Sequence, residues 1–191
     1  MKTTLSKFCM VTLMGVIMFS ACKKEEQAIT PPVPGNEFLT TVKWRFENAA
    51  NAADTVWAVW KDTTILGGTN PNAFANLKKS VTYKLTVHLY DESHPSAIVD
   101  LTHEINVERA NYHTYWLFPS GGILNHVTFS ATDYDTNNPP LHIGMTGTFV
   151  TDATVCSGKE EGVLRHQPNC KNGTYAPGSS DSDIFMNISI N

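Results

Sequence analysis

Three oxygen-bearing side chains at alternate positions, Asp133, Asp135 and Asn137, have a spacing that could do chemistry. Carboxylate and amide oxygens spaced in this way open the loops that bind Ca²⁺, a hard cation that prefers oxygen ligands. The bidentate acid expected at the twelfth position of such a loop is missing, because a glycine stands there. Asp181 or Asp183 could complete a calcium site from another strand. The alternative is an Asx-rich turn that hydrogen-bonds to its own backbone ahead of two prolines.

Histidine is frequent in this chain, which contains seven of them. Imidazole is the commonest ligand of transition metals in proteins, and zinc or copper needs three or four donors that converge on one ion. The candidate zinc or copper ligands are His88, His94, His103 and His113. No pair of histidines has the spacing of a known metal motif. The alternative is therefore that they are scattered surface residues or hydrogen-bonded core residues.

The N-terminus has the layout of a bacterial lipoprotein signal. Two lysines precede an apolar run, residues 8–19, which has the length of a signal-peptide core and is short for a membrane span. Ser20 and Ala21 then precede Cys22, and this arrangement resembles a lipobox, whose cysteine is alkylated by diacylglycerol. We predict a signal peptide over residues 1–21 and lipidation of Cys22. Because two or more acyl chains anchor a protein stably, the mature domain would be tethered and would not span the membrane.

The segment that follows Cys22 indicates where the tether would place the protein. Residues 23–26, KKEE, resemble the signal that sends lipoproteins of Bacteroidetes to the outer face of the outer membrane. We therefore expect surface display, with the periplasmic face as the alternative. Prolines in residues 22–37 favour an extended, semi-rigid linker. If the signal were an ordinary cleaved one, or an uncleaved anchor, Cys22 would be incidental.

Two cysteines lie in the part of the chain that is expected to fold, Cys156 and Cys170. In an exported protein, two cysteines with turn-rich sequence between them are typical of a disulfide. We predict that they pair, which would stabilise the fold by about 3 kcal/mol in the chain-entropy model. The alternative is a pair of metal-binding thiolates, although the C-x-x-C spacing of such sites is absent.

Composition excludes some classes of function. The chain has 191 residues and a formal net charge of −4, and two of its lysines lie in the predicted signal peptide. A nucleic-acid partner is not expected, because binding phosphates requires clustered cations. There is no G-x-S-x-G motif, no evident pair of carboxylates in an aromatic groove, and no free cysteine if the predicted disulfide forms. We therefore expect a protein that is not an enzyme.

Apolar and polar residues alternate with a period of two along much of the chain, as in strands with one buried face. The alternation is clearest over residues 42–46, 81–89, 101–107, 112–118, 127–131 and 184–190. Further strands are expected over residues 56–61, 143–151 and 162–167. Long helical periodicity is absent, and only residues 73–79 could form a helical turn.

These strands, separated by turns rich in Gly, Pro and Asn, predict an all-β protein. Because each strand has one apolar and one polar face, we predict an antiparallel two-sheet β-sandwich that is immunoglobulin-like in the loose sense. It would form a single domain over residues 38–191. In the fourth strand, Trp116 and Phe118 would lie on the apolar face, and His113 and Tyr115 on the polar face.

Four stretches of the sequence together resemble a family of uncharacterised Bacteroidetes outer-membrane lipoproteins. They are LKKSVTYKLTVHLYDES, DLTHEINVERANYHTYW, DYDTNNPPLHIG and VLRHQPNCKNGTYAPGSSDSD. Family members are similar but have a more acidic central segment, and Asn-Gly where this chain has Asn137-Asn138, which weakens a calcium site carried over from them. The resemblance implies an outer-membrane lipoprotein, often encoded beside a TonB-dependent receptor, and it implies no catalytic residues.

The leading functional hypothesis from the sequence is a non-enzymatic, surface-tethered binding or accessory module. It would serve the uptake of a nutrient or a metal together with an outer-membrane receptor. The first alternative is a zinc- or copper-binding protein that uses its histidines. The second is a structural or adhesive module stiffened by Ca²⁺ at Asp133 and Asp135.

Overall fold

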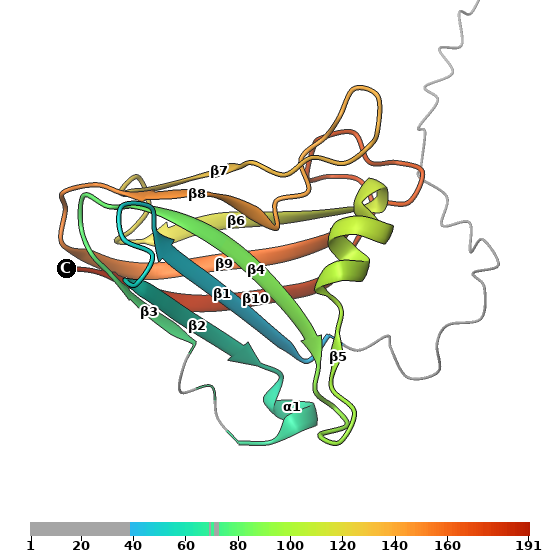
Figure 1. Cartoon of the computed structure of the whole chain (residues 1–191), viewed down its shortest axis with the longest axis horizontal. Helices are drawn as coiled ribbons and strands as arrows, with labels where there is room; N and C mark the ends of the chain where they lie inside the picture. The colour runs from blue at the N-terminus through green and yellow to red at the C-terminus, as the bar shows by residue number, and fades with distance from the viewer. Residues whose placement is uncertain (1–38, 69, 71–72) are drawn as a thin grey trace, which may run out of the picture.

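The described part of the chain is a sandwich of two β-sheets (Figure 1). This computed structural model describes residues 39–68, 70 and 73–191. The fold class predicted from the alternation is therefore confirmed. The predicted signal peptide, Cys22 and the linker lie outside the described residues. Of the helices within the described ranges, none has the length and apolar character needed to cross a membrane.

The first sheet has the strand order β2-β1-β4-β8-β7, and β5 pairs with the end of β4. Its strands are β1 (Thr41–Asn48), β2 (Thr55–Lys61), β4 (Thr82–Asp91), β5 (Val99–Asp100), β7 (Val127–Ala131) and β8 (Thr146–Thr151). Every pairing in this sheet is antiparallel. The edge strand β7 borders a cavity.

The second sheet has the strand order β3-β10-β9-β6. Its strands are β3 (Phe74–Leu77), β6 (His113–Gly121), β9 (Cys156–His166) and β10 (Ser179–Ile190). The prediction of a helical turn over residues 73–79 is wrong, because β3 pairs in parallel with β10. Ala75 and Leu77 are buried while Phe74 is 46% exposed, so this short segment follows the period of a strand.

In the described part of the chain, three short helical segments connect the strands: α1 (Thr63–Leu66), the π-helical η1 (Glu104–Glu108) and the 3₁₀-helical η2 (Ala110–Tyr112). The strand predicted over residues 101–107 is therefore wrong. Leu101 and Ile105 are both buried, and Ile105 N donates to Leu101 O at 3.0 Å. Residues four apart share a helix face as well as a strand face, so alternation alone could not separate the two. Val107, the third member of the pattern, is exposed.

The core lies between the two sheets, where their inward faces meet. In β1 and β4 it consists of the residues that the alternation predicts: Val42, Trp44, Phe46, Tyr83, Leu85, Val87 and Leu89. The ring of Phe46 packs edge-on against those of Trp44 and Phe149. Burial of this apolar surface is the main source of the stability of the sandwich.

One hydrogen bond crosses the core and joins the two sheets. Trp44 Nε1 in β1 donates to the Tyr115 hydroxyl in β6 at 3.0 Å, and both side chains are buried. Gly162 in β9 leaves room for this contact, since a Cβ there would lie 2.3 Å from the Tyr115 hydroxyl and 2.6 Å from the Trp44 ring. The contact therefore fixes three strands relative to one another.

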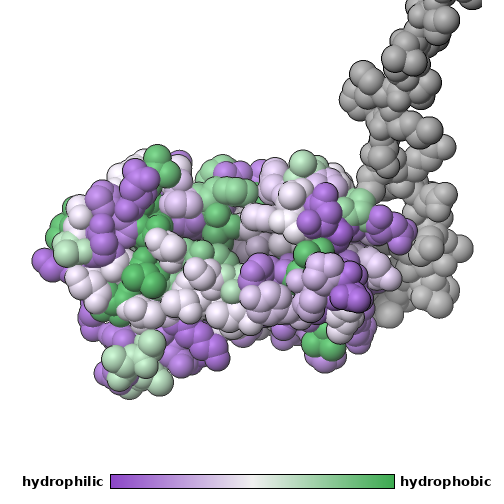
Figure 2. Space-filling view, turned by 90° about the horizontal axis from the view of Figure 1, so that it is seen from above, coloured by the Kyte–Doolittle hydropathy of each residue, from purple (hydrophilic) through white to green (hydrophobic). Residues whose placement is uncertain are grey.

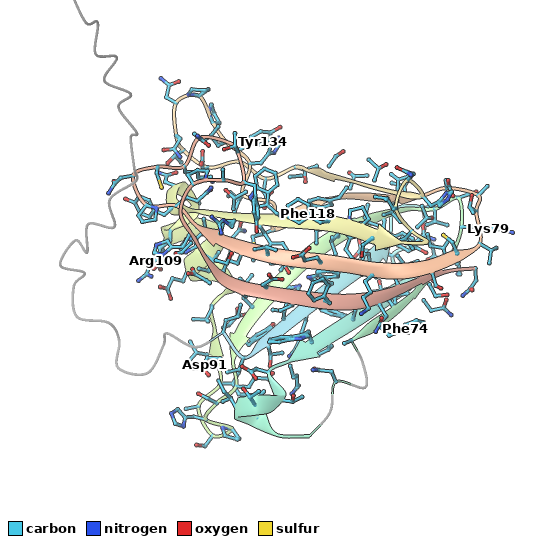
Figure 3. The ribbon with its side chains drawn as sticks, turned by 180° about the vertical axis from the view of Figure 1, so that it is seen from behind. Phe74, Lys79, Asp91, Arg109, Phe118 and Tyr134 are labelled. Carbon is cyan, nitrogen blue, oxygen red and sulfur yellow. The ribbon has the colours of Figure 1, made fainter. Side chains whose placement is uncertain are left out.

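The faces of β6 are the reverse of the prediction. Tyr115 points into the core, while Trp116 and Phe118 lie on the opposite face, half-buried, and pack edge-on against Tyr175 (Figure 3 labels Phe118). Tyr175 belongs to the loop between β9 and β10, which covers this outer face. When both faces of a strand are covered, apolar alternation does not indicate which of them is the core.

One acidic side chain of β9 lies on the inward face of the strand, between the two sheets. Glu160 is 1% exposed, and no described residue hydrogen-bonds to its Oε2 atom. Burial raises the pKa of Glu160 from its ordinary value of 4.5 to about 8. At neutral pH the folded protein therefore holds this carboxyl mainly in its protonated form.

This raised pKa makes stability depend on pH. Between pH 4.5 and about 8 the folded state holds a proton that the unfolded state has released, so the free energy of unfolding falls as pH rises. At 1.36 kcal/mol per pKa unit, Glu160→Gln should gain up to about 5 kcal/mol over the wild type across this window. Urea denaturation of both proteins at several pH values measures this difference, and parallel pH profiles would contradict it.

Candidate functional site

Side chains from three strands converge at one end of the second sheet. His113 begins β6, His166 ends β9 and Asp181 lies near the start of β10. Antiparallel pairing brings these positions together and places His113 directly opposite His166. One nitrogen or oxygen atom from each side chain lies within 4.8 Å of the others. The helical turns and long loops gather at this same end, on the right of Figure 1.

His113 is the buried member of the cluster, with a side chain that is 2% exposed. Its Nδ1 lies 3.0 Å from the backbone carbonyl oxygen of Arg109, which the turns of η1 and η2 bring to this position (Figure 3 labels Arg109). A carbonyl oxygen only accepts, so Nδ1 carries a hydrogen and donates it. Nε2 faces Asp181 Oδ2 at 3.3 Å. Metal-binding histidines are commonly held by this kind of second hydrogen bond.

His166 lies parallel to His113. The two ring centroids are 4.7 Å apart, and the ring planes differ by 4°. His166 Nδ1 lies 3.9 Å from Asp181 Oδ1, and its side chain is about a third exposed. The stack therefore turns one nitrogen of each ring towards the same carboxylate.

Asp181 reaches the two rings because β10 is irregular at this point. Ser180 pairs with Arg165 and Ser182 pairs with Leu164, so Asp181 is the extra residue of a β-bulge. A bulge locally redirects a side chain, and bulges are frequent beside functional sites. Half-exposed Asp181 thus approaches the rings from the solvent side.

Arg165 holds the loop that leads to Asp181. Its Nη2 atom lies within hydrogen-bond distance of the carbonyl oxygens of residues 176–178, and its Nη1 donates to Ser180 Oγ at 2.8 Å. The guanidinium also lies 4.7 Å from the ring centre of Tyr175. Gly178, at φ +83°, lets the loop pass His166, because a Cβ there would lie 2.1 Å from the His166 carbonyl oxygen. Buried polar contacts therefore support the site from behind.

The three donor atoms are close enough to converge on a transition-metal ion if the two stacked rings rotate, because an imidazole nitrogen binds a metal in its ring plane and the planes now differ by only 4°. Donors bound at 2.0–2.1 Å to tetrahedral zinc lie about 3.4 Å from each other. The His113–Asp181 separation of 3.3 Å already has this value, and the widest separation in the cluster must close by about 1.4 Å. Because His166 and Asp181 are partly exposed, a fourth coordination position would face solvent.

The structure does not bring the four predicted histidines together. Only His113 belongs to the cluster. His88 lies in β4 with its ring 5.5 Å from that of Trp57, and burial lowers the pKa of His88. His94 is exposed in the turn after β4, and His103 is exposed beside Glu108.

The contacts of the Asp133 region are those of the Asx-rich turn alternative, and they use carboxylate oxygens that a calcium site would also need. Asp133 accepts from the backbone N–H groups of Gly144 and Thr146, each at 2.8 Å. Asp135 Oδ1 accepts from the N–H groups of Asn137 at 3.0 Å and Leu141 at 2.8 Å. These carboxylates therefore close the turn with their own oxygens, as Asx residues do.

A lysine occupies the position that a cation would need. Lys171 Nζ lies 2.7 Å from Asp135 Oδ2, with both side chains buried, and also donates to the Ala110 carbonyl oxygen at 2.9 Å. Burial would raise the pKa of Asp135, but the hydrogen bonds from Lys171 and from the turn outweigh it and lower that pKa. The Asp135 carboxylate is therefore ionised at neutral pH. Burial lowers the pKa of Lys171 although Asp135 opposes that shift, and Ca²⁺ would have to displace the Lys171 amino group.

The predicted disulfide between Cys156 and Cys170 is not formed, because Cys156 is a free thiol. Cys156 begins β9, an 11-residue strand, and Cys170 lies beyond its other end. At about 3.3 Å per residue the strand separates its ends by more than ~30 Å, whereas disulfide-bonded Cα atoms lie within about 7 Å. The prediction failed because the intervening residues form an extended strand and not a turn.

Sequence reasoning considered Asp181 only as a calcium ligand and did not select His166. No local signal could have joined them to His113, because the three residues come from different strands. Comparisons of the chain with models of protein families, with curated proteins and with solved structures found no match. The assignment of the site therefore rests on its geometry.

The buried ion pair makes a testable contribution to stability. Lys171→Met keeps most of the aliphatic stem but leaves the buried Asp135 carboxylate without its cation. We expect the free energy of unfolding to fall by about 3–5 kcal/mol, as when one partner of a buried pair is removed. Urea denaturation near neutral pH measures this, with Lys159→Met at an exposed position as the control. Equal stability of the two variants would show that the pair contributes little.

Proposed function

We propose that the protein is a lipid-anchored, non-enzymatic binding module that holds a zinc or copper ion between His113, His166 and Asp181. It would serve metal uptake at the outer membrane. The proposal combines the three-residue cluster with the anchor expected at Cys22. It deepens the expectation of a nutrient- or metal-binding accessory protein by naming the ligand and its residues.

One observation carries the metal assignment: the 3.3 Å approach of His113 Nε2 to Asp181 Oδ2. Since Nδ1 donates to Arg109, a neutral His113 offers only a lone pair at Nε2, and a carboxylate also offers only lone pairs. Two acceptors at this distance require something positive between them, either a proton on Nε2 or a metal ion. A metal ion also accounts for the second ring, which turns Nδ1 to the same carboxylate.

A role in binding and release is supported by how open the cluster is. Structural zinc sites are closed by four protein ligands, whereas three ligands and a solvent-facing position permit exchange. The neighbouring polar side chains have structural tasks. Gln167 accepts from Thr114 and donates to the carbonyl oxygens of Thr174 and Pro177. These hydrogen bonds of Gln167 support the loop.

The proposed location and partner rest on the sequence. The lipobox-like FSAC, the KKEE segment and the resemblance to Bacteroidetes lipoproteins support an anchor on the outer face of the outer membrane. A TonB-dependent receptor is the partner that this resemblance suggests. An exchangeable metal site on a tethered domain could pass its ion to such a receptor.

Metal titration tests the site directly. We expect purified wild-type protein to bind one Zn²⁺ or Cu²⁺ near neutral pH, and His166→Ala and Asp181→Asn each to weaken binding at least about 100-fold, more than loss of an outer hydrogen-bond partner costs. Calorimetry measures the affinities.

The matched controls are His94→Ala and His103→Ala, which remove exposed histidines away from the cluster. Both should bind metal as the wild type does. If the cluster variants also retain full affinity, or if the wild type takes up no metal, the proton alternative holds and His113–Asp181 is a structural ion pair.

The anchor has its own test. Cys22→Ser should release the protein from the membrane fraction, because acyl chains and not the folded domain would hold it there. Fractionation of cells that express either form, with mass spectrometry of the N-terminal peptide, measures this. An unmodified Cys22 in membrane-bound wild-type protein would disprove lipidation.

A further inference from the structure

A second site lies at the open edge of the sandwich, apart from the metal cluster. The edge strands β7 and β6 belong to different sheets and are the last strands of each. A cavity of ≈ 680 Å³ lies along them, lined mainly by residues of β6, β7 and the chain around β8. Figure 2 looks onto this edge and shows hydrophobic side chains between polar ones. The volume is in the range of sites for small organic molecules.

The walls of this cavity are apolar and aromatic. Phe129 of β7, Phe149 of β8 and Tyr115 of β6 contribute rings, and Leu117 and Val127 contribute aliphatic groups. The Phe129 ring packs on the backbone of the neighbouring strand. A Cβ added to Gly147 of β8 would lie 2.3 Å from the Cε2 atom of Phe129. Such walls would bind the hydrocarbon part of a ligand.

Glu160 is the carboxylic acid among the lining residues, and its side chain lies on the inward side of β9. Its position follows from the alternation of the strand, because Gly162, two residues on, faces Tyr115 and Trp44 in the core. Glu160 is 1% exposed, and none of the described residues hydrogen-bonds to Oε2. A buried carboxyl oxygen without a partner destabilises the fold, so the position of Oε2 beside a cavity points to a ligand that supplies one.

The chemistry of the walls selects the class of ligand. Glu160 is mainly protonated at neutral pH, but once ionised it attracts a positive charge strongly, because little solvent screens a carboxylate in an apolar cavity. The faces of aromatic rings also attract ammonium groups. An anion would be repelled by Glu160, and a neutral hydrocarbon would leave the acid unpaired. His142 and Ser130, which also line the cavity, could bind a further polar group of the same ligand.

We propose that this cavity binds a small apolar amine, with its ammonium group paired to Glu160 and its hydrocarbon body against Phe129 and Phe149. The metal cluster and this cavity share the strands β6 and β9 but no side chain. The inference is therefore independent of the proposed metal-binding function.

The test uses three probes of the same length and different charge: phenylbutylamine, phenylbutanol and phenylbutyrate. Full-length protein is titrated at about pH 8.5, where the acid is largely ionised and an alkylamine is still protonated. NMR shift changes of the cavity residues report binding. We expect the amine to bind at least about tenfold more tightly than the alcohol, and the carboxylate to bind weakest.

Two variants locate the binding. Glu160→Gln keeps the shape and should remove the preference for the amine, while Ala131→Trp fills the cavity from β7 and should abolish binding of amine and alcohol alike. His166→Ala is the control and should bind the amine as the wild type does. Equal affinities of amine and alcohol for the wild type, or an amine preference that survives Glu160→Gln, would overturn the proposal.

Discussion

The hydrogen bond from Trp44 to Tyr115 is the contact on which the rest of the structure depends. It crosses the core between buried side chains and fixes the inward face of β6, with the bare backbone of Gly162 making room for it. His113 lies two residues before Tyr115 and therefore shares its face of the strand. Leu117, two residues after it, lines the cavity. One pairing thus positions both the candidate metal site and the candidate amine site.

The acids of this protein show how partners decide what a carboxylate does. Asp135 is buried beside Lys171 and turn N–H groups, so it is ionised and structural. Asp181 faces two imidazole rings at the surface and has oxygens that can bind a metal ion. Glu160 Oε2 has no hydrogen-bond partner among the described residues, and burial raises the pKa of this carboxyl group. Only the last two have binding capacity left for a ligand.

Sequence reasoning predicted the two-sheet architecture and the inward residues of β1, β4, β7 and β10, because a single covered face produces clean alternation. It failed where other physics applies. Leu101 and Ile105 fit a helix as well as a strand, and Tyr175 covers the outer face of β6. The site was predictable only at His113, because its other members depend on strand pairing and on a bulge at Asp181.

The most direct test of the central claim is X-ray absorption spectroscopy of the zinc-loaded protein. We expect a first shell of nitrogen and oxygen atoms at about 2.0–2.1 Å, with the outer-shell scattering of two imidazole rings. If the spectrum of His166→Ala lacks the scattering of one imidazole ring, that ring belongs to His166. A sulfur shell at about 2.3 Å, from a thiol such as Cys156, would contradict metal binding by His113, His166 and Asp181, as would a shell without imidazole.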